Sequence, residues 1–82
     1  MIQFSHVIND PQGLHARPIA SIAAALASVG SSVELELNGR TADARDLLGM
    51  LGLEARGGDE LLVTVEGADE QQAAELLKTT LP

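Results

Sequence analysis

Six consecutive residues, Gly13 to Pro18, contain the side chains of this sequence that are best suited to phosphoryl chemistry. His15 offers an imidazole, which is a nucleophile when its ring is neutral. Arg17 offers a guanidinium, whose N–H groups bind phosphate oxygens. An imidazole beside a guanidinium suits a transferable phosphoryl group, because phosphoryl transfer mainly requires positioning and stabilisation of charge. The sequence shows no obvious carboxylate base beside His15 and no cluster of metal ligands.

The element that must position these residues is a helix that follows them. Ile19 to Val29 places aliphatic side chains at spacings of three and four, which predicts a helix with one buried stripe. His15 then lies near the N-cap, and Pro18 fits the first turn, where no backbone N–H is needed. That turn leaves the N–H groups of Ala16 and Arg17 without helical partners, at the positive end of the helix dipole. We therefore expect a phosphoryl group on His15 to contact the Arg17 side chain and these two amides.

Four stretches alternate between apolar and polar residues, and each predicts a half-buried strand. The strands are Ile2 to Ile8, Val33 to Leu37, Arg40 to Ala44 and Glu60 to Glu66, and helices are expected over Ile19 to Val29, from Asp46 through Leu53, and after Asp69. The order βαββαβα predicts an α+β fold with a four-stranded antiparallel sheet and helices on one face. His6 alternates with core residues of the first stretch, so we interpret it as a packed or edge-strand histidine.

Local signals predict how several of these elements begin, end and turn. Asn38-Gly39 between two strand-like runs predicts a hairpin. Gly30 is expected to end the first long helix as its C′ residue. Asp46 is a plausible N-cap for the short leucine-rich helix. Asp69 with Gln72 three residues later fits a capping box at the start of the last helix.

Composition excludes several classes of function. The chain has 82 residues, no cysteine, one aromatic residue (Phe4), twelve acidic and five basic residues, and a formal net charge of −7. This length predicts one domain over residues 1–82, and the charge disfavours nucleic acid and anionic membranes as partners. Residues 1–6 contain no basic residue and no apolar stretch typical of a secretory signal, and no apolar segment approaches the ~20 residues of a membrane span. We expect a soluble, cytoplasmic protein that inserts into no membrane.

The run Gly-Leu-His-Ala-Arg-Pro at residues 13–18, followed by an alanine-rich helix, resembles HPr, the histidine phosphocarrier family of the bacterial sugar phosphotransferase system. Leu47 to Leu53 is similar to the short second helix of that family, and the likeness covers nearly the whole chain. The resemblance implies an open-faced β-sandwich with three helices on one face of the sheet. It also implies that His15 takes a phosphoryl group on Nδ1 from enzyme I and passes it to an enzyme IIA domain, while Arg17 helps to neutralise the phosphoryl oxygens. Such a carrier is expected to be no enzyme and to need no cofactor; the sequence leaves the oligomeric state open, although a carrier visited by two partners in turn should work as a monomer.

The resemblance further implies a docking face, formed by the first two helices and used by both partners. The residues expected on this face are Ala20, Ala24, Leu47, Leu48 and Leu51. Three leucines on so short a helix cannot all point inward, which favours some exposure beside the site. The alternative that Leu48 and Leu51 are simply core residues stays open at this point.

Two departures from the family pattern stand out. Many relatives have a regulatory serine where this chain has Asp46, which has no hydroxyl to phosphorylate; Asp46 is then either a fixed charge beside the docking face or, as we favour, a helix N-cap. Relatives often carry lysines near Ala24 and Ala27, so either the partner faces are less acidic or docking here depends more on apolar contact. These differences leave open a nitrogen-type or dihydroxyacetone-type branch. Beside the carrier stand two alternatives, a regulatory module that docks in a phosphorylation-dependent way on regulatory proteins, and a small enzyme or inert structural domain.

Overall fold

The computed structural model describes all residues 1–82, and its elements follow the predicted order. The strands are β1 (Ile2–Val7), β2 (Ser32–Leu37), β3 (Arg40–Asp43) and β4 (Glu60–Glu66), and the helices are α1 (Ala16–Leu26), α2 (Leu47–Gly52) and α3 (Glu70–Thr80). The strands form one sheet in the order β1-β4-β2-β3, and every neighbouring pair is antiparallel. The predicted α+β fold and its element order are therefore confirmed. None of the helices is long and apolar enough to cross a bilayer.

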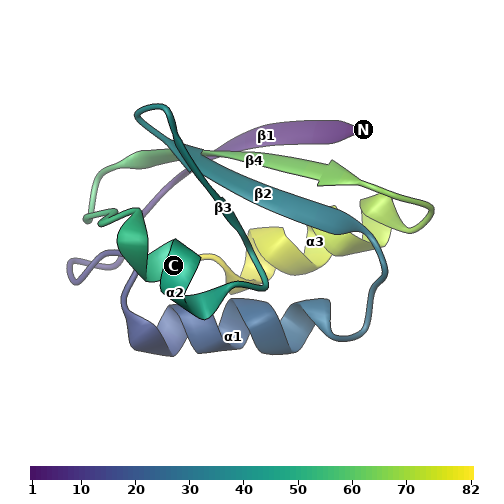
Figure 1. Ribbon diagram of the computed structural model, residues 1–82, viewed down its shortest axis with the longest axis horizontal. Coiled ribbons are helices and arrows are strands. Elements are labelled where there is room, and N and C mark those ends of the chain that lie inside the picture. Colours follow the sequence, from purple (N-terminus) through teal and green to yellow (C-terminus); the bar gives the residue numbers. More distant parts are fainter.

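The three helices all cover the same face of the sheet, and the other face is left uncovered (Figure 1). The alternation in each strand explains this arrangement, because every second side chain points toward the helices. In the central strands β2 and β4 the inward side chains are fully or almost fully buried. They pack with the buried stripe of α1, formed by Ile19, Ile22 and Leu26, and with Leu77 of α3. One core therefore lies between the sheet and the helices, and packing against it positions the helices on the sheet.

The edge of the sheet next to β4 is β1, and His6 lies on this edge. The Nε2 atom of His6 lies 2.6 Å from the carbonyl oxygen of Pro82, and the side chain is partly buried. The interpretation of His6 as a packed edge-strand histidine is confirmed.

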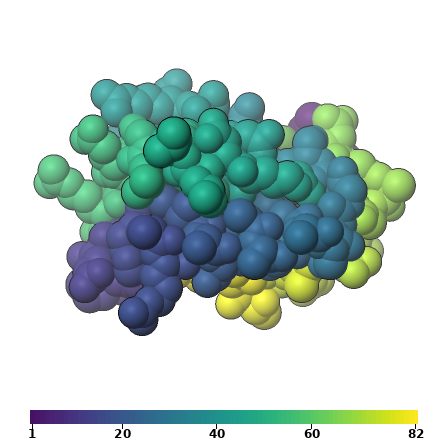
Figure 2. Space-filling view, turned by 60° about the horizontal axis from the view of Figure 1, so that its bottom comes forward, coloured from purple at the N-terminus to yellow at the C-terminus, as the bar shows by residue number.

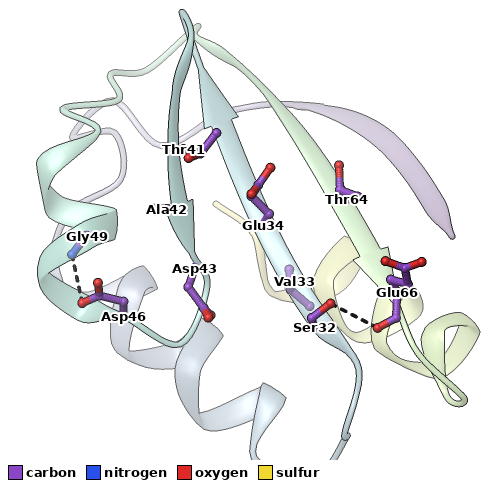
Figure 3. Close-up of a pocket in the computed structure, with 10 residues that line it drawn as sticks. All are labelled: Ser32, Val33, Glu34, Thr41, Ala42, Asp43, Asp46, Gly49, Thr64 and Glu66. Atoms are coloured by element: carbon purple, nitrogen blue, oxygen red, sulfur yellow. Dashed lines mark hydrogen bonds between the residues drawn. The ribbon is translucent and has the colours of Figure 1, made fainter.

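Two local predictions hold in detail. Asn38 and Gly39 both have positive φ, 52° and 83°, as a two-residue type I′ hairpin requires, and they join β2 to β3. Asp46 is the N-cap of α2, where its Oδ1 accepts a hydrogen bond of 3.1 Å from the Gly49 N–H (Figure 3). The capping interpretation of Asp46 therefore has a direct structural basis.

The predicted end of the first helix is wrong. The helix α1 ends at Leu26 with Ala27 as its C-cap, and Gly30 has no positive φ. A side chain binds the carbonyl groups at and after the helix end instead: the Arg45 guanidinium donates to the carbonyl oxygens of Leu26 (3.0 Å), Val29 (2.9 Å) and Ser31 (2.9 Å). A long-range donor thus replaces the glycine stop that the local sequence suggested.

The predicted capping box at the last helix is also wrong. Asp69 occupies the N-cap position of α3 but makes no capping hydrogen bond. Its carboxylate accepts instead from the backbone N–H groups of Gly30 (2.9 Å) and Ser31 (3.0 Å) and from the buried Ser31 hydroxyl. The Ser31 hydroxyl, followed by the Gly30 N–H, holds the pKa of Asp69 below its usual value. Asp69 therefore stabilises the loop after α1, and both of its oxygens point to that loop instead of capping α3.

Candidate functional site

The loop before α1 is held against the chain that follows α2. Gly13 has a φ of 70°, and a Cβ atom at this position would lie only 2.3 Å from the carbonyl oxygen of Ala55. The Leu14 N–H donates to that same oxygen at 3.0 Å, and the Leu14 side chain is buried in the core. Only glycine can make this close approach with a left-handed backbone. The loop therefore delivers His15 to a fixed position at the start of α1.

His15 is the N-cap of α1, as predicted, and its backbone is extended, with φ −99° and ψ −176°. Its carbonyl accepts the first helical hydrogen bond, from Ile19 at 3.2 Å, but its side chain does not cap the helix. The imidazole is therefore partly exposed, with 30% of its surface accessible, and stays available for other contacts. Pro18 is buried in the first turn, where its missing N–H leaves nothing unpaired.

A carboxylate lies directly beside the ring. The Asp10 Oδ2 atom is 2.9 Å from His15 Nε2, and Asp10 Oδ1 accepts a 2.8 Å hydrogen bond from the Gln12 N–H. The Gln12 N–H contributes most to holding the pKa of Asp10 below its usual value, the hydrogen bond with His15 adds to it, and the Arg17 charge contributes a smaller part. Asp10 is thus an ionised acceptor near neutral pH. The expectation that no carboxylate stands beside His15 is wrong.

The sequence indicates that Asp10 forms a turn, but it does not indicate the contact between Asp10 and His15. An Asp before Pro11 is a turn signal, and an Asp side chain in a turn often accepts from the N–H two residues later. That turn predicts the bond to Gln12. The second carboxylate oxygen reaches His15 only because the turn folds back over five residues, which no local pattern specifies.

Arg17 belongs to the same surface hollow as His15. Five residues line this hollow, and they are Asp10, Gln12, His15, Ala16 and Arg17. The Arg17 guanidinium makes no hydrogen bond and no ion pair within the chain, and Ala16 and Arg17 are both exposed. The structure therefore brings together the imidazole, the guanidinium and the first-turn amides that the sequence pointed to. Their role in binding a phosphoryl group stays a prediction.

The predicted docking residues lie on the surfaces of α1 and α2. Ala20 and Ala24 of α1 are exposed, and the exposed fractions of Leu47, Leu48 and Leu51 are 47%, 80% and 44%. Figure 2 shows α1 and α2 lying side by side on one face of the molecule, and the two helices are in contact. Met50 is the α2 side chain that enters the core. The alternative that Leu48 and Leu51 are core residues is therefore wrong.

A second hollow lies elsewhere, around β2, β3, β4 and the start of α2 (Figure 3). It contains the carboxylates of Glu34, Asp43, Asp46 and Glu66 and no basic side chain. Such a lining repels a phosphoryl group, whereas the hollow at His15 contains the Arg17 cation. The hollow at the start of α1 is the better anion site.

A family model described as "PTS HPr component phosphorylation site" matches residues 2–81. The chain belongs to the HPr family. It is 38% identical over 72 residues to the phosphocarrier protein HPr of Lysinibacillus sphaericus, which is 88% of this chain and 82% of that protein. Membership makes the chain a phosphocarrier of the phosphotransferase system, which works with the enzymes of that system.

Solved HPr structures share the fold over nearly the whole chain. A phosphocarrier protein HPr from Bacillus anthracis superposes with a TM-score of 0.90 at 26% identity, covering 99% of this chain and 96% of that one. A histidine-containing phosphocarrier protein from Mycoplasma gives a TM-score of 0.91 at 26% identity, covering 96% and 90%. The sheet order and the placement of α1 therefore belong to the HPr fold.

Proposed function

We propose that this HPr-family protein carries one phosphoryl group on His15, taking it from enzyme I and passing it to an enzyme IIA domain. The observation that carries the proposal is the partly exposed, uncapped imidazole of His15 at the first turn of α1, with Arg17 in the same hollow. The core draws on all of α1, α2, α3 and the sheet, which supports residues 1–82 acting as one domain.

The chemistry of this hollow fits a phosphoryl group better than a neutral ligand. The N–H groups of Ala16 and Arg17 lie in the first turn and have no helical acceptor. Together with the Arg17 guanidinium they offer donors and positive charge to the oxygens of a phosphoryl group on His15. A partner has to bring the donor or the acceptor into place, and the exposure of the hollow allows this. In this proposal each molecule carries one phosphoryl group at a time, and the protein catalyses no reaction without its partners.

The test begins with intact-mass measurement after incubation with phosphoenolpyruvate and a catalytic amount of enzyme I. The parent is expected to gain one acid-labile phosphoryl group, and His15→Ala none. Arg17→Met is expected to slow uptake by about tenfold, because a charge-assisted contact to the phosphoryl oxygens is worth about 1.5 kcal/mol or more. Arg40→Met removes a charge from an exposed arginine of β3 and is the matched control.

Onward transfer is measured by adding an enzyme IIA domain to the phosphorylated protein. Loss of the phosphoryl group to that domain is the expected result. Uptake without onward transfer would instead favour the regulatory module, and no uptake with a cognate enzyme I would contradict the carrier role of His15.

We further propose that Ala20, Ala24, Leu47, Leu48 and Leu51 form the surface on which partners dock. The surface is apolar, carries no lysine and continues from the hollow at His15 along α1 and α2. Asp46 serves this surface as the N-cap that starts α2, and it offers no hydroxyl for regulatory phosphorylation. Asp46→Ser, which keeps a capping oxygen, is expected to leave uptake at His15 intact.

Leu48→Asp tests this surface directly. Leu48 is 80% exposed, so the substitution is expected to change the free energy of unfolding by less than about 0.5 kcal/mol. It is expected to weaken association with enzyme I by about tenfold, since an apolar contact is replaced by a charge that must be desolvated. Affinity of the parent is expected to change little with salt, and a steep loss with salt would contradict apolar docking.

A further inference from the structure

The ring of His15 has two nitrogens, and the structure treats them differently. The Nε2 atom lies 2.9 Å from Asp10 Oδ2, whereas Nδ1 has no hydrogen-bond partner in the chain. We propose that Asp10 is a positioning residue for His15, which keeps the hydrogen on Nε2 and so leaves the lone pair of Nδ1 to accept the phosphoryl group. This inference rests on the proposed function of His15.

The hydrogen-bonding capacity of each group determines this assignment. An ionised carboxylate can only accept, so the nitrogen that faces Asp10 must be the donor. The position of Asp10 is fixed independently of the ring, because its other oxygen accepts from the Gln12 N–H at 2.8 Å. In a neutral imidazole only one nitrogen carries a hydrogen, and the other then has a free lone pair. Asp10 therefore determines the tautomer as well as the orientation of His15.

The same contact serves both steps of the carrier cycle. In uptake, the Nδ1 lone pair forms a bond to phosphorus while the bond from phosphorus to the donor breaks, and that electron pair stays on the donor. The ring then carries a positive charge, with its hydrogen still on Nε2 beside the Asp10 carboxylate, which stabilises that charge. In onward transfer an acceptor atom bonds to phosphorus and the P–N electron pair returns to Nδ1. The hydrogen on Nε2 remains in place throughout, so the ring needs no proton from solvent.

Asp10→Asn provides a sharp test because an amide has one acceptor oxygen and one donor nitrogen. If the amide oxygen keeps the bond from the Gln12 N–H, the amide N–H₂ faces Nε2 of His15. The ring can satisfy this arrangement only by moving its hydrogen to Nδ1, which removes the lone pair needed for uptake. Asp10→Ala removes both contacts and leaves a mixture of the two tautomers.

Asp43→Asn is the matched control. Asp43 Oδ1 accepts from the Arg45 N–H at 2.8 Å, two residues along, which is the same turn that Asp10 makes with Gln12. No hydrogen bond or ion pair joins Asp43 to a histidine. The control therefore loses one carboxylate in the same local geometry without touching His15.

The experiment measures the ¹⁵N shifts of the His15 ring at a pH where the ring is neutral, in unphosphorylated protein. The parent and Asp43→Asn are expected to show a protonated Nε2 and an unprotonated Nδ1, and Asp10→Asn the reverse. Uptake from enzyme I is then followed by mass, and the phosphorylated nitrogen is identified by ³¹P NMR. Asp10→Asn is expected to slow uptake at Nδ1 by at least about tenfold, as a wrong histidine tautomer does in other sites.

Either of two results overturns the inference: a hydrogen on Nδ1 in the parent, or a parent-like tautomer and rate in Asp10→Asn. The ring shifts need no partner protein, so they decide the role of Asp10 even if the parent takes up no phosphoryl group. That last result would contradict the proposed function of His15 and not the contact between Asp10 and Nε2.

Discussion

The two ends of helix α1 differ in how their polar groups are paired: side chains bind the backbone at the C-terminal end, and no side chain caps the N-terminal end. At its C-terminal end the Arg45 guanidinium donates to three carbonyl oxygens, and the Asp69 carboxylate accepts from two N–H groups of the following loop. At its N-terminal end His15 leaves the first turn uncapped, and the Arg17 guanidinium binds nothing in the chain. The polar groups after the C-terminal end are thus paired within the chain, whereas the backbone donors and the guanidinium at the N-terminal end are left free for a ligand. Four substitutions test this difference between the two ends.

Gly13→Ala is expected to have the largest effect. The new Cβ would meet the carbonyl oxygen of Ala55, and the residue would have to keep a φ of 70°. We expect a loss of about 3 kcal/mol in the free energy of unfolding, from a backbone clash and a left-handed conformation together. Urea unfolding measures this free energy. A loss of less than about 1 kcal/mol in the free energy of unfolding would mean that the loop before α1 adjusts easily.

Arg45→Met is expected to cost about 2 kcal/mol in the free energy of unfolding. The substitution keeps an apolar stem but removes the guanidinium donor from the carbonyl groups of Val29 and Ser31, while the Leu26 carbonyl keeps only the bond from the Val29 N–H. Uptake at His15 is expected to stay unchanged, because the altered contacts lie at the other end of α1. Urea unfolding and intact-mass uptake are measured on the same sample. A slower uptake with unchanged stability would reverse the proposed division between the two ends.

Asp69→Asn is expected to change how stability depends on pH. The folded-state pKa of Asp69 lies below its ordinary value of 3.8, so its carboxylate contributes fully above that value and loses its contribution as the pH falls through the folded-state pKa. The stability difference between parent and variant should therefore narrow as the pH falls below 3.8. Urea unfolding at a series of pH values measures the gap, and a gap that stays constant would contradict the assigned role.

Gly30→Ala is expected to have the smallest effect, and with the opposite sign to Gly13→Ala. A Cβ atom at Gly30 meets nothing within 4 Å, and the residue has no positive φ. The substitution is expected to raise the free energy of unfolding by about 0.5 kcal/mol, because it restricts the unfolded chain. A thermal unfolding midpoint below that of the parent would show that Gly30 is needed after all.

Local patterns in the sequence predicted most of the fold. Strand alternation, the Asn38-Gly39 turn and the Asp46 cap are signals between near neighbours, and each was confirmed. The two errors, at Gly30 and Asp69, have a common cause. Both positions offered a plausible local partner. In the structure, however, Asp69 accepts from Gly30 and Ser31, which lie 39 and 38 residues earlier, and Arg45 donates to Leu26, which lies 19 residues earlier. Contacts at such separations depend on how the elements pack, which periodicity does not encode.

The candidate site was predictable to a similar degree. The motif around His15 placed the imidazole and Arg17 at the start of one helix, and the structure has them there. The exposure of Leu48 followed from counting leucines on a helix too short to bury them all. Asp10 was missed because its approach to His15 depends on the turn at Gln12, whose direction no residue pattern gives.

The order of strands in the sheet has a consequence for how the chain is made. Strand β4 lies between β1 and β2, and it is the only neighbour of β1, so Ile2 pairs with Val65 from nearly the opposite end of the chain. A nascent chain that has not yet reached residue 60 can pair β2 with β3 and nothing else in the sheet. Closing so large a loop is slow compared with forming that hairpin. Strand β1, although it is made first, therefore joins the sheet only after β4 has been made.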